Sequence, residues 1–515
     1  MASRKVKMLR QVLAVAPLIV IIFQNCAEHF SPRREIASTS IISGAFAEKE
    51  IIIRLKNQGA RDELLNWSVS HGMTHEHEWP DIHTHHFSWT ENASVDEMLS
   101  EVYSLMPSDV SYAEPNYSFK KLDIGDDLQI LASGTVTANA SSVQTTAPIQ
   151  FKETWPTLAV NGTRPIVAVI DSGIDLSHSV FVNSNALWRN TQEVPNNGID
   201  DDSNGFVDDI NGWDFANNDN NPSDDQGHGT HVAGIVLGTG QNIFGTTQVP
   251  AKIQIMALKF LTAAGDGKTS DAIQAVYYAV KNGAKVINNS WGGAGYSRTL
   301  IDAIAYAYSN KVLFVAAAGN DGRNIDGTPM YPASYMVPNV LPVAATNSTD
   351  QLTSFSNFGA LTVQIAAPGA SILSTYPNNQ FATLSGTSMA TPFVAGTAAL
   401  MAYERPQMTS YQIRTILTSQ VDQINGLTNF VWGKGRLNVL KATTFAKSAI
   451  LDTDQPSYSL ASQSKESSPS GCGMVISSGP KPPDGNSWAA VLILLFPVIV
   501  AIISRNAPIT LRVDA

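Results

Sequence analysis

Short apolar strands alternate with amphipathic helices across residues 148–447, and this alternation constrains the fold more than any other feature of the chain. The helical pattern is clear in "SDAIQAVYYAVKNGA", which ends close to a glycine. The strand-like runs are "PIVAVID", "KIQIMALKFL", "KVINNSWG", "KVLFVAAAGN" and "VLPVAAT". Because strands that are apolar on both faces pair in parallel beneath helices, we predict an α/β domain, a mostly parallel sheet with helices on both faces. Active sites in such folds gather at the carboxyl ends of the strands.

A smaller unit and two linkers flank this region. Residues 48–120 start with the strand-like "EKEIIIRLK" and end with "VSYAEPNYSF", which together with two intervening helices predicts a small α+β domain. Residues 121–147 contain no aromatic residue and few apolar runs, so we expect a linker there. Residues 448–486 are rich in Ser, Gly and Pro and predict a second linker.

Both ends of the chain carry export or attachment signals. Residues 1–26 place basic residues before an apolar run, as signal peptides do. Cys26 stands where a bacterial lipoprotein signal puts its lipidated cysteine, and the alternatives are an uncleaved anchor or cleavage after Ala47. Residues 487–505 hold an apolar run from Trp488 to Ile503 followed by Arg505, which fits either a membrane anchor or a cleaved surface-sorting tag. Either interpretation predicts an exported protein held at a bacterial cell envelope, with a membrane contact at one or both termini.

Charge and cysteine content exclude two classes of protein. The net charge is -11 and charged residues make up 15% of the chain, so no basic stripe for nucleic acid is expected. Only two cysteines are present, one near each end, so no disulfide framework holds the fold. The bulk properties indicate a globular secreted protein.

Three residues at the ends of predicted elements supply the parts of a nucleophilic site. Asp171 ends the strand "IVAVID", His228 lies in the turn "GHGTH", and Ser388 enters a helix in "GTSMATPFVAG". A serine hydroxyl needs a base to take its proton, and the base needs an orienting carboxylate. The backbone N–H groups at the start of the Ser388 helix would favour a developing oxyanion. Each residue alone also fits a structural role in a cap, turn or core.

The three motifs together are more specific. "VAVIDSGID", "GHGTHVAG" and "GTSMATPFVAG", in this order, resemble the subtilisin-like serine proteases, or subtilases. The resemblance covers residues 148–447 and implies that Asp171 orients, His228 acts as base and then acid, and Ser388 attacks a peptide carbonyl. It also implies that Asn320 in "AAAGN" completes an oxyanion hole, and that residues 48–120 are an inhibitory propeptide removed by autocleavage between about 118 and 148.

The resemblance also implies a groove that binds an extended peptide. The substrate-binding residues it implies are Ser290, Trp291, Gly292, Ala318, Gly319 and Met330. Trp291 stands where many subtilases carry leucine, and Met330 stands where a smaller residue is usual. We therefore expect an endopeptidase with an apolar or mid-sized preference at the cleaved residue, whose partners are protein or peptide substrates and its own propeptide.

An acidic loop predicts bound Ca²⁺. "GIDDDSNGFVDD" spaces side-chain oxygens at alternate positions before a glycine turn, as calcium loops do, although a solvated acidic loop is the alternative. The following "GWDFANNDNNP" resembles the calcium-binding loop of thermitase-type subtilases. The predicted metal ligands are Asp200, Asp202, Asn204, Asp208, Asp209, Asp214 and Asp219.

Six histidines cluster in "HGMTHEHEWPDIHTHH" within the small N-terminal unit. We expect mostly exposed, solvated rings, with a shared metal ion or a pH-dependent release of the propeptide as the alternatives.

Two other functions compete with the protease. A catalytically silent subtilase-like scaffold or adhesin has no reason to keep the full set of catalytic residues. A metal-dependent hydrolase would need a carboxylate that completes a site at His228 and His231, and the motif offers none between them.

Overall fold

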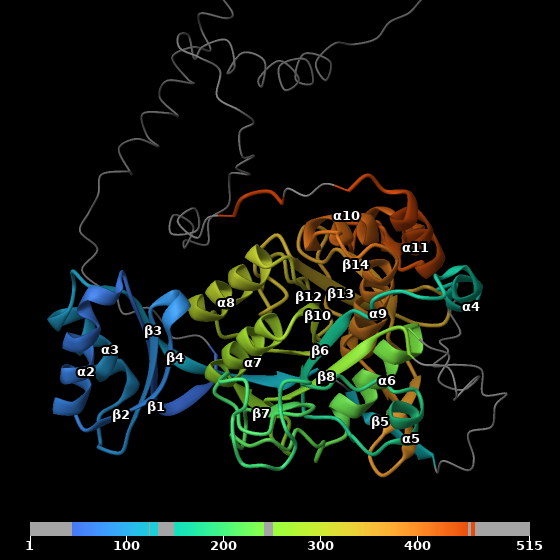
Figure 1. The fold of residues 1–515 in the computed structure, drawn as a ribbon. Helices are drawn as coiled ribbons and strands as arrows, with labels where there is room; N and C mark the ends of the chain where they lie inside the picture. The colour runs from blue at the N-terminus through green and yellow to red at the C-terminus, as the bar shows by residue number, and fades with distance from the viewer. Residues whose placement is uncertain (1–43, 123, 132–148, 241–250, 452–454, 459–515) are drawn as a thin grey trace, which may run out of the picture. The chain divides into compact units, whose positions relative to one another are not determined.

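A nine-stranded sheet forms the centre of the larger domain (Figure 1). The computed structural model describes residues 44–122, 124–131, 149–240, 251–451 and 455–458, all within one compact unit. The strands run in the order β17 (Asp422–Gln423), β18 (Gly435–Arg436), β14 (Ile365–Pro368), β13 (Val340–Thr346), β12 (Leu313–Ala317), β10 (Ala284–Asn289), β6 (Ile166–Asp171), β8 (Gln254–Lys259) and β7 (Gly212–Asp214). All neighbours pair in parallel except β17 and β18, which confirms the predicted mostly parallel sheet.

Helices cover both faces of this sheet, as predicted. Successive residues of β6 point to opposite faces, so Val167 and Val169 belong to one apolar core while Ala168 and Ile170 belong to the other. The first core is covered by α5 (Ser179–Asn183), α6 (His228–Gly240), α9 (Thr387–Glu404), α10 (Ser410–Ser419) and α11 (Val439–Ser448). The second is covered by α7 (Thr269–Lys281) and α8 (Arg298–Ser309). Short helical turns cover Phe151–Thr154 (α4), Gln58–Ala60, Pro80–Ile82, Trp155–Thr157 and Asn425–Leu427.

The N-terminal unit is an antiparallel sheet with two helices, as the sequence predicts. Its elements are β1 (Phe46–Leu55), α2 (Arg61–Ser70), β2 (Met73–Trp79), β3 (Thr84–Trp89), α3 (Val95–Leu105) and β4 (Val110–Lys121). The strands pair in the order β4-β1-β3-β2, and both helices pack on one face around their own apolar core. Ser94 and Glu97 close the start of α3 with a reciprocal capping box.

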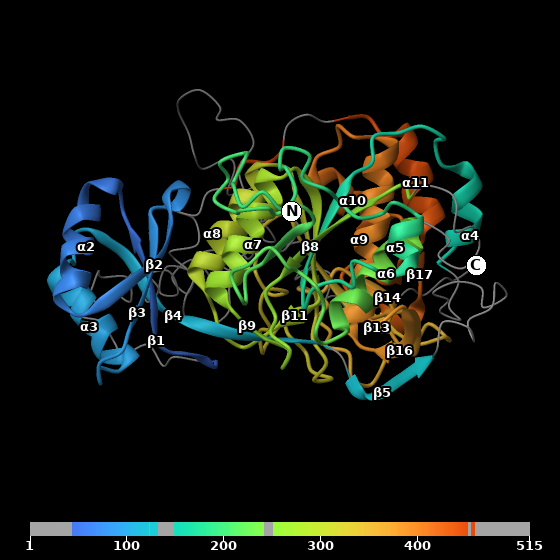
Figure 2. The same cartoon turned by 60° about the horizontal axis from the view of Figure 1, so that its bottom comes forward.

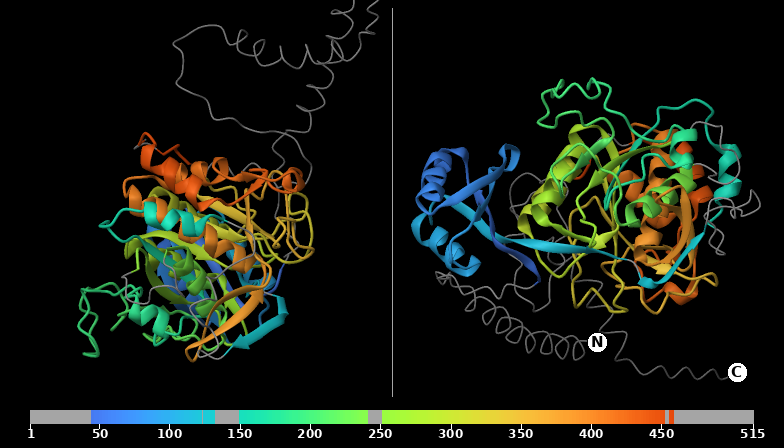
Figure 3. Two further views of the ribbon diagram at one scale, coloured as in Figure 1. Left: turned by 90° about the vertical axis from the view of Figure 1, so that its right-hand side faces the viewer. Right: turned by 90° about the horizontal axis from the view of Figure 1, so that it is seen from below.

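Strand β4 continues beyond this unit and pairs with the larger domain. Its last residues lie between β9 (Asp266–Lys268) and β11 (Trp291–Gly292), antiparallel to both (Figure 2). The chain then forms β5 (Ile124–Leu131), which pairs with β16 (Gln380–Ser385) beside β15 (Ile372–Tyr376). Figure 3 follows this segment from below. The stretch expected to be a linker therefore contains a strand at its start, because backbone pairing with β16 orders a sequence that has little apolar pattern of its own.

Several sequence-based expectations fall outside the described residues. They concern the signal peptide with Cys26, most of the first linker, and the C-terminal linker and apolar run. Within the described part of the chain, no helix is both long and apolar enough to cross a bilayer.

Candidate active site

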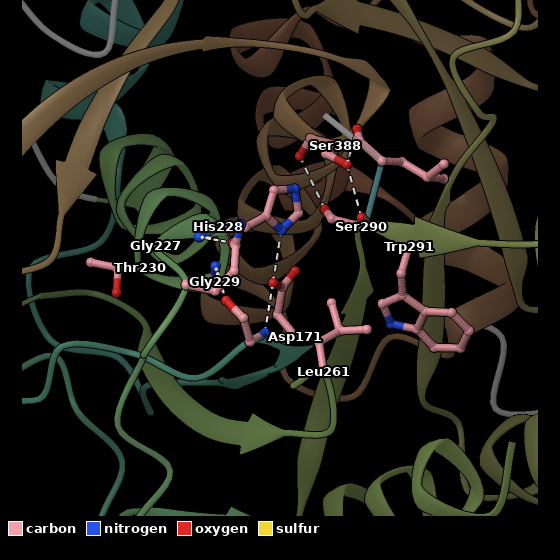
Figure 4. A network of polar contacts seen from close by, with 12 residues as sticks. Asp171, Gly227, His228, Gly229, Thr230, Leu261, Ser290, Trp291 and Ser388 are labelled. Atoms are coloured by element: carbon pink, nitrogen blue, oxygen red, sulfur yellow. Dashed lines mark hydrogen bonds and ion pairs between the residues drawn. The ribbon is translucent and has the colours of Figure 1, made fainter. Parts of the chain in front are cut away.

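Asp171 and His228 form a buried pair at one end of the central sheet. Asp171 is the last residue of β6 and His228 is the first residue of α6. Asp171 Oδ1 lies 2.7 Å from His228 Nδ1 and also accepts the N–H of Ser172 at 2.7 Å. Since a carboxylate only accepts, Nδ1 carries the proton and the second ring nitrogen faces the side of Ser388 (Figure 4).

A close backbone approach brings α6 up to the loop after β6. A Cβ atom at Gly229 would lie 2.2 Å from the carbonyl oxygen of Gly173, so only glycine fits at this position. The N–H of Gly229 in turn donates to Ser172 Oγ at 2.8 Å. Gly229 thus allows the start of α6, with His228, to lie this close to the loop that follows Asp171.

Ser388 is the second residue of α9 and is fully buried. Its hydroxyl donates to the carbonyl oxygens of Leu122 and, at 2.8 Å, of Ser290. Ser290 Oγ donates back to the carbonyl oxygen of Ser388 at 3.0 Å. The Ser388 hydroxyl is therefore held between the carbonyl oxygen of Ser290 and a carbonyl of the chain's own N-terminal segment.

Two N–H donors converge on the carbonyl oxygen of Leu122. Asn320 Nδ2 lies 2.8 Å from it and the backbone nitrogen of Ser388 lies 3.3 Å from it. The side-chain oxygen of Asn320 accepts both the N–H of Thr387, at 2.9 Å, and its hydroxyl, at 2.8 Å. These two bonds fix the amide so that its NH₂ group points at the Leu122 oxygen. This is the arrangement that an oxyanion hole requires.

Asn288 and Asn289, the other asparagines considered for the oxyanion hole, donate to other acceptors than the Leu122 carbonyl oxygen. Asn288 donates to Ser290 Oγ at 3.1 Å, and Asn289 donates to the carbonyl oxygen of Val315 at 3.2 Å. Both side chains are fully buried in the sheet. They therefore brace the strand end that carries Ser290.

The residues expected to bind substrate hold an extended segment of the same chain. Trp291 pairs with Lys121, Gly292 pairs with Lys120, and the N–H of Leu122 donates to Ser290 O at 3.2 Å. On the opposite side, the N–H of Lys121 donates to Gly265 O at 3.1 Å. Backbone pairing on both sides is how a peptide is bound by strand addition.

The buried Leu122 side chain packs beside Gly292 and Met330. A Cβ atom at Gly292 would lie 3.1 Å from Leu122 Cδ1 and 3.4 Å from Met330 Cε. Met330 Cε lies 3.2 Å from the matching position at Gly319, and Ala318 is buried beside it. The end of the Met330 side chain thus lies close to both Gly292 and Gly319.

The chain matches the subtilase family of peptidases (Peptidase_S8) over residues 162–435, which is just over half of its length. The chain belongs to the subtilase family. It is similar to thermitase of Thermoactinomyces vulgaris, with 36% identity over 297 residues that cover 58% of this chain and 94% of that protein. It is also similar to minor extracellular protease Epr of Bacillus subtilis, with 32% identity over 72% of this chain and 50% of Epr.

A solved structure supports the fold. Fervidolysin from Fervidobacterium pennivorans, a keratinolytic enzyme related to subtilisin, matches with a TM-score of 0.60 and 23% identity. The match covers 79% of this chain and 62% of fervidolysin. At this identity the likeness shows the fold alone.

Two polar side chains of β4 in this subtilase cap helices of the larger domain, which sequence reasoning missed. Glu114 accepts from Ser297 Oγ at 2.7 Å and from the N–H groups of Arg298 and Thr299 at the start of α8. Asn116 Oδ1 accepts the N–H of Ser270, in the first turn of α7, at 3.0 Å. The spacing of Glu114 and Asn116 could have shown that both side chains lie on the same face of β4, because residues two apart on a strand face the same side. Burial raises the pKa of Glu114 above its ordinary value.

The acidic loop groups three carboxylates, and one of them was not predicted. Glu193, Asp200 and Asp202 each place one oxygen within 4.8 Å of the other two. Three such carboxylates repel one another unless a cation lies between them, and hard oxygen donors suit Ca²⁺. Glu193 lies outside the "DDDSNGFVDD" pattern and enters the group only through the fold.

The other predicted ligands of this loop make different contacts. Asn204 donates through Nδ2 to Asp202 and Asp209. Asp208 accepts the N–H groups of Asn197 and Gly198, and Asp209 accepts Asn190 Nδ2 at 2.7 Å and the Tyr278 hydroxyl at 2.5 Å. These bonds shape the loop around the three carboxylates.

Asp214 and Asp219 do not join a comparable group among the described residues. Asp214 accepts the backbone N–H and the Nδ2 of Asn217, and Asp219 accepts the N–H of Asn221. Burial raises the pKa of Asp214. The carboxylates of this second loop are therefore engaged in turn formation.

The remaining histidines are more buried than expected. The prediction of exposed rings is wrong for His85, which is 0% exposed, and for His86, which is 7% exposed, because both faces of β3 are covered. His85 lies beside Phe87 of the apolar core, and His86 lies beside Asn116, which donates to Ser270 of the larger domain. His75, Glu78 and His85 lie close together, yet both oxygens of Glu78 are bound by Arg61, so we assign no metal there. His231 contacts the carbonyl oxygens of Ile372 and Ala382, each at 3.0 Å, and forms no shared site with His228.

Proposed function

We propose that this subtilase is an exported serine endopeptidase that acts through Asp171, His228 and Ser388 and is made as an autoprocessed zymogen. The observation that carries the proposal is the Leu122 carbonyl oxygen, which meets Asn320 Nδ2 at 2.8 Å and the Ser388 N–H at 3.3 Å while touching the Ser388 hydroxyl. A peptide carbonyl in that position lies beside the serine hydroxyl and the two donors that would stabilise its oxyanion.

Each residue has one task in the proposed reaction. His228 takes the proton of Ser388 as the hydroxyl adds to the carbonyl carbon, and then gives it to the leaving amine. Asp171 holds the ring through Nδ1 and stabilises the imidazolium that forms. Asn320 and the Ser388 N–H bind the oxyanion of the tetrahedral intermediate. Water then attacks the acyl-enzyme with His228 again acting as base.

Residues 48–120 serve as an intramolecular inhibitor in this proposal. Strand β4 fills the peptide groove, and Glu114 and Asn116 fasten it to α8 and α7. Tyr112 adds a hydrogen bond of 2.7 Å to Asp302, whose carboxylate also pairs with Arg54. While these contacts persist, no other peptide can pair with β11.

Calcium is the proposed structural cofactor. Glu193, Asp200 and Asp202 supply a set of oxygen donors that fits the ion. Bound there, Ca²⁺ would offset the negative charge of the loop whose Asp209 accepts the Tyr278 hydroxyl of α7. Its proposed contribution is to stability.

Export follows from the terminal sequences and is consistent with Epr, a relative that is named as extracellular. We propose attachment to a bacterial surface through a terminus. The alternative of a silent scaffold would leave the arrangement of Asp171, His228, Ser388 and Asn320 without a purpose.

A serine-directed fluorophosphonate probe tests the function. The mature wild-type enzyme should be labelled and should cleave casein, whereas Ser388→Ala should do neither. Ser290→Ala is the matched control. This variant should still be labelled, because Ser290 also lies in the groove but is not the residue that the probe modifies. Labelling that survives in Ser388→Ala, or absence of both labelling and cleavage in the wild type, would refute the proposal.

A further inference from the structure

The first turn of α6 finds its hydrogen-bond acceptors outside the helix. The first four N–H groups of any helix have no acceptor within it, so other groups must satisfy them when the helix start is buried. In α6 the acceptors for the N–H groups of His228, Gly229, Thr230 and His231 are, in this order, Gln226 Oε1, Ser172 Oγ, Asp224 Oδ2 and Gly227 O. Ser172 belongs to a different segment of the chain, the loop that follows β6.

Both carboxylate oxygens of Asp224 accept hydrogen bonds from the turn that enters α6. Its Oδ2 accepts the N–H of Thr230 at 2.8 Å and the Thr230 hydroxyl at 2.6 Å. Its Oδ1 accepts the N–H groups of Gln226, at 3.0 Å, and Gly227, at 2.8 Å. His228 lies between these donors along the chain (Figure 4), so the carboxylate fixes the backbone on both sides of the histidine.

The hydroxyl of Ser172 joins this carboxylate to the end of β6. It donates to Asp224 Oδ1 at 2.9 Å and accepts the N–H of Gly229 at 2.8 Å. Ser172 is fully buried and directly follows Asp171, whose Oδ1 accepts both the N–H of Ser172 and the Nδ1 proton of His228, each at 2.7 Å. A displacement of Ser172 would therefore move the oxygen that orients the imidazole.

Backbone hydrogen bonds join the same two loops. The N–H of Ile174 donates to Pro222 O at 3.0 Å, and the N–H of Asp224 donates to Ile174 O at 3.3 Å. Gly173 has a φ of 103°, and a Cβ atom there would lie 2.6 Å from Pro222 O, so the loops approach as closely as a backbone allows. The hydrogen bond between the Ser172 and Asp224 side chains thus crosses a junction whose backbone is already fixed.

Building on the proposed function, we propose that Ser172 and Asp224 are positioning residues for His228. Their hydrogen bond holds the imidazole at the distance from Asp171 at which the ring takes the proton of Ser388. Catalytic groups must lie within roughly 0.5 Å of their productive geometry, and a misplacement of about 1 Å costs up to about 100-fold in rate. Because the peptide groove is formed by β9 and β11, loss of this link should lower kcat and leave KM almost unchanged.

The first experiment measures steady-state kinetics of the mature enzyme with Ser172→Ala. The kcat per active site, with sites counted by fluorophosphonate titration to completion, should fall by about 10- to 100-fold while KM stays within about 2-fold. Because only sites that react are counted, a loss of folded enzyme does not lower this kcat. Ser177→Ala, at an exposed position on the same loop, is the matched control and should keep kcat within about 2-fold of the wild type. An unchanged kcat in Ser172→Ala would overturn the proposal.

The second experiment asks whether Ser172 and Asp224 act as one unit. Asp224→Ala should lower kcat at least as much as Ser172→Ala, because the whole turn loses its acceptor. The double variant should stay within about 3-fold of Asp224→Ala alone, since side chains of one hydrogen-bond network have non-additive effects. Two losses that multiply in the double variant would show that the residues act independently and would overturn the proposal. If Asp224→Ala does not fold, the measurements on Ser172→Ala still decide.

The proton on His228 Nδ1 provides a readout that a purely structural role would not move. Held 2.7 Å from Asp171 Oδ1, it should give a proton NMR resonance far downfield of the other ring N–H groups. In Ser172→Ala this resonance should move upfield or exchange faster with water, whereas Ser177→Ala should leave it in place. An identical resonance in Ser172→Ala and the wild type would contradict the positioning role. A wild-type enzyme that takes no fluorophosphonate would instead refute the proposed function.

Discussion

The side-chain nitrogen of Asn320 lies 2.8 Å from the carbonyl oxygen of Leu122, a residue 198 positions earlier in the chain. Thr387 fixes the orientation of that amide by donating twice to its oxygen. The donor is therefore oriented before any charge develops, which is the condition under which an oxyanion hole contributes most to the rate.

Replacing Asn320 by alanine should lower kcat by roughly two to three orders of magnitude with little change in KM, because the lost hydrogen bond strengthens in the transition state. Steady-state kinetics on a peptide substrate measures both parameters. Thermal unfolding controls for damage to the fold. A variant with normal kcat would place the oxyanion elsewhere.

Asp171→Asn should lower kcat by about 10⁴-fold. An amide in place of the carboxylate can donate to His228 Nδ1, so the ring turns to the tautomer that cannot accept the Ser388 proton. The bond affected is the 2.7 Å contact between Asp171 Oδ1 and Nδ1. Asp175→Asn, on the same loop, is the matched control and should retain activity within a few-fold.

Removal of calcium should lower the melting temperature of the mature enzyme by about 5–10 °C, which corresponds to an ion held at about 100 times its Kd. Calorimetry with and without EDTA measures the shift. Glu193→Gln should abolish it, because this variant loses one of the three clustered carboxylates, whereas Asp219→Asn should keep it. An unchanged melting temperature in EDTA would exclude the calcium site.

Glu114→Ala should release the cleaved pro-segment at least about 10-fold faster, because three donors at the start of α8 lose their acceptor and buried unsatisfied donors cost about 1–3 kcal/mol. The measurement is the time for which the pro-segment co-elutes with the enzyme after cleavage. Glu76→Ala, at an exposed position on β2, is the control and should behave as the wild type. Equal release rates for both variants would show that the cap does not hold the inhibitor.

Mild acid should loosen strands β2 and β3. Burial, reinforced by His86, His75 and Lys281 and opposed by Glu78, lowers the pKa of His77 to about 4. Burial likewise lowers the pKa of His85 to about 4. The unfolded segment takes up protons below about pH 6.5, while the folded one resists until about pH 4, so its stability is complete above pH 6.5 and falls between these values.

Hydrogen exchange of the uncleaved Ser388→Ala precursor measures this effect. After correction for the intrinsic rates, amides of β2 and β3 should be less protected at pH 5.5 than at pH 7.5, by about 10-fold for each histidine that must be charged on opening. His77→Gln should reduce the difference. Identical protection at both pH values would contradict the prediction.

The sequence by itself determined the α/β architecture, the order of the three motifs that hold Asp171, His228 and Ser388, and the α+β nature of the N-terminal unit. These features are encoded locally, in apolar periodicity and in glycine-bounded turns such as "GHGTH" that only one backbone geometry satisfies. The positions of Asp171 at a strand end and of His228 and Ser388 at helix starts follow from the same local patterns.

Only the tertiary structure decided which residues from distant segments meet. Glu193 lies beside Asp200 and Asp202, and Glu114 accepts an N–H at the start of α8. The carbonyl oxygen of Leu122 accepts from Asn320 and from the N–H of Ser388. Spacing in the sequence shows at most that Glu114 and Asn116 share one face of β4; it does not identify the partner of any of these residues, because each contact depends on the register of β4 between β9 and β11 or on the path of a loop. The register is set by pairing and packing along the whole strand, including Phe119 against Trp291, and this is why the contact of Leu122 with Ser388 emerges from the fold rather than from a motif.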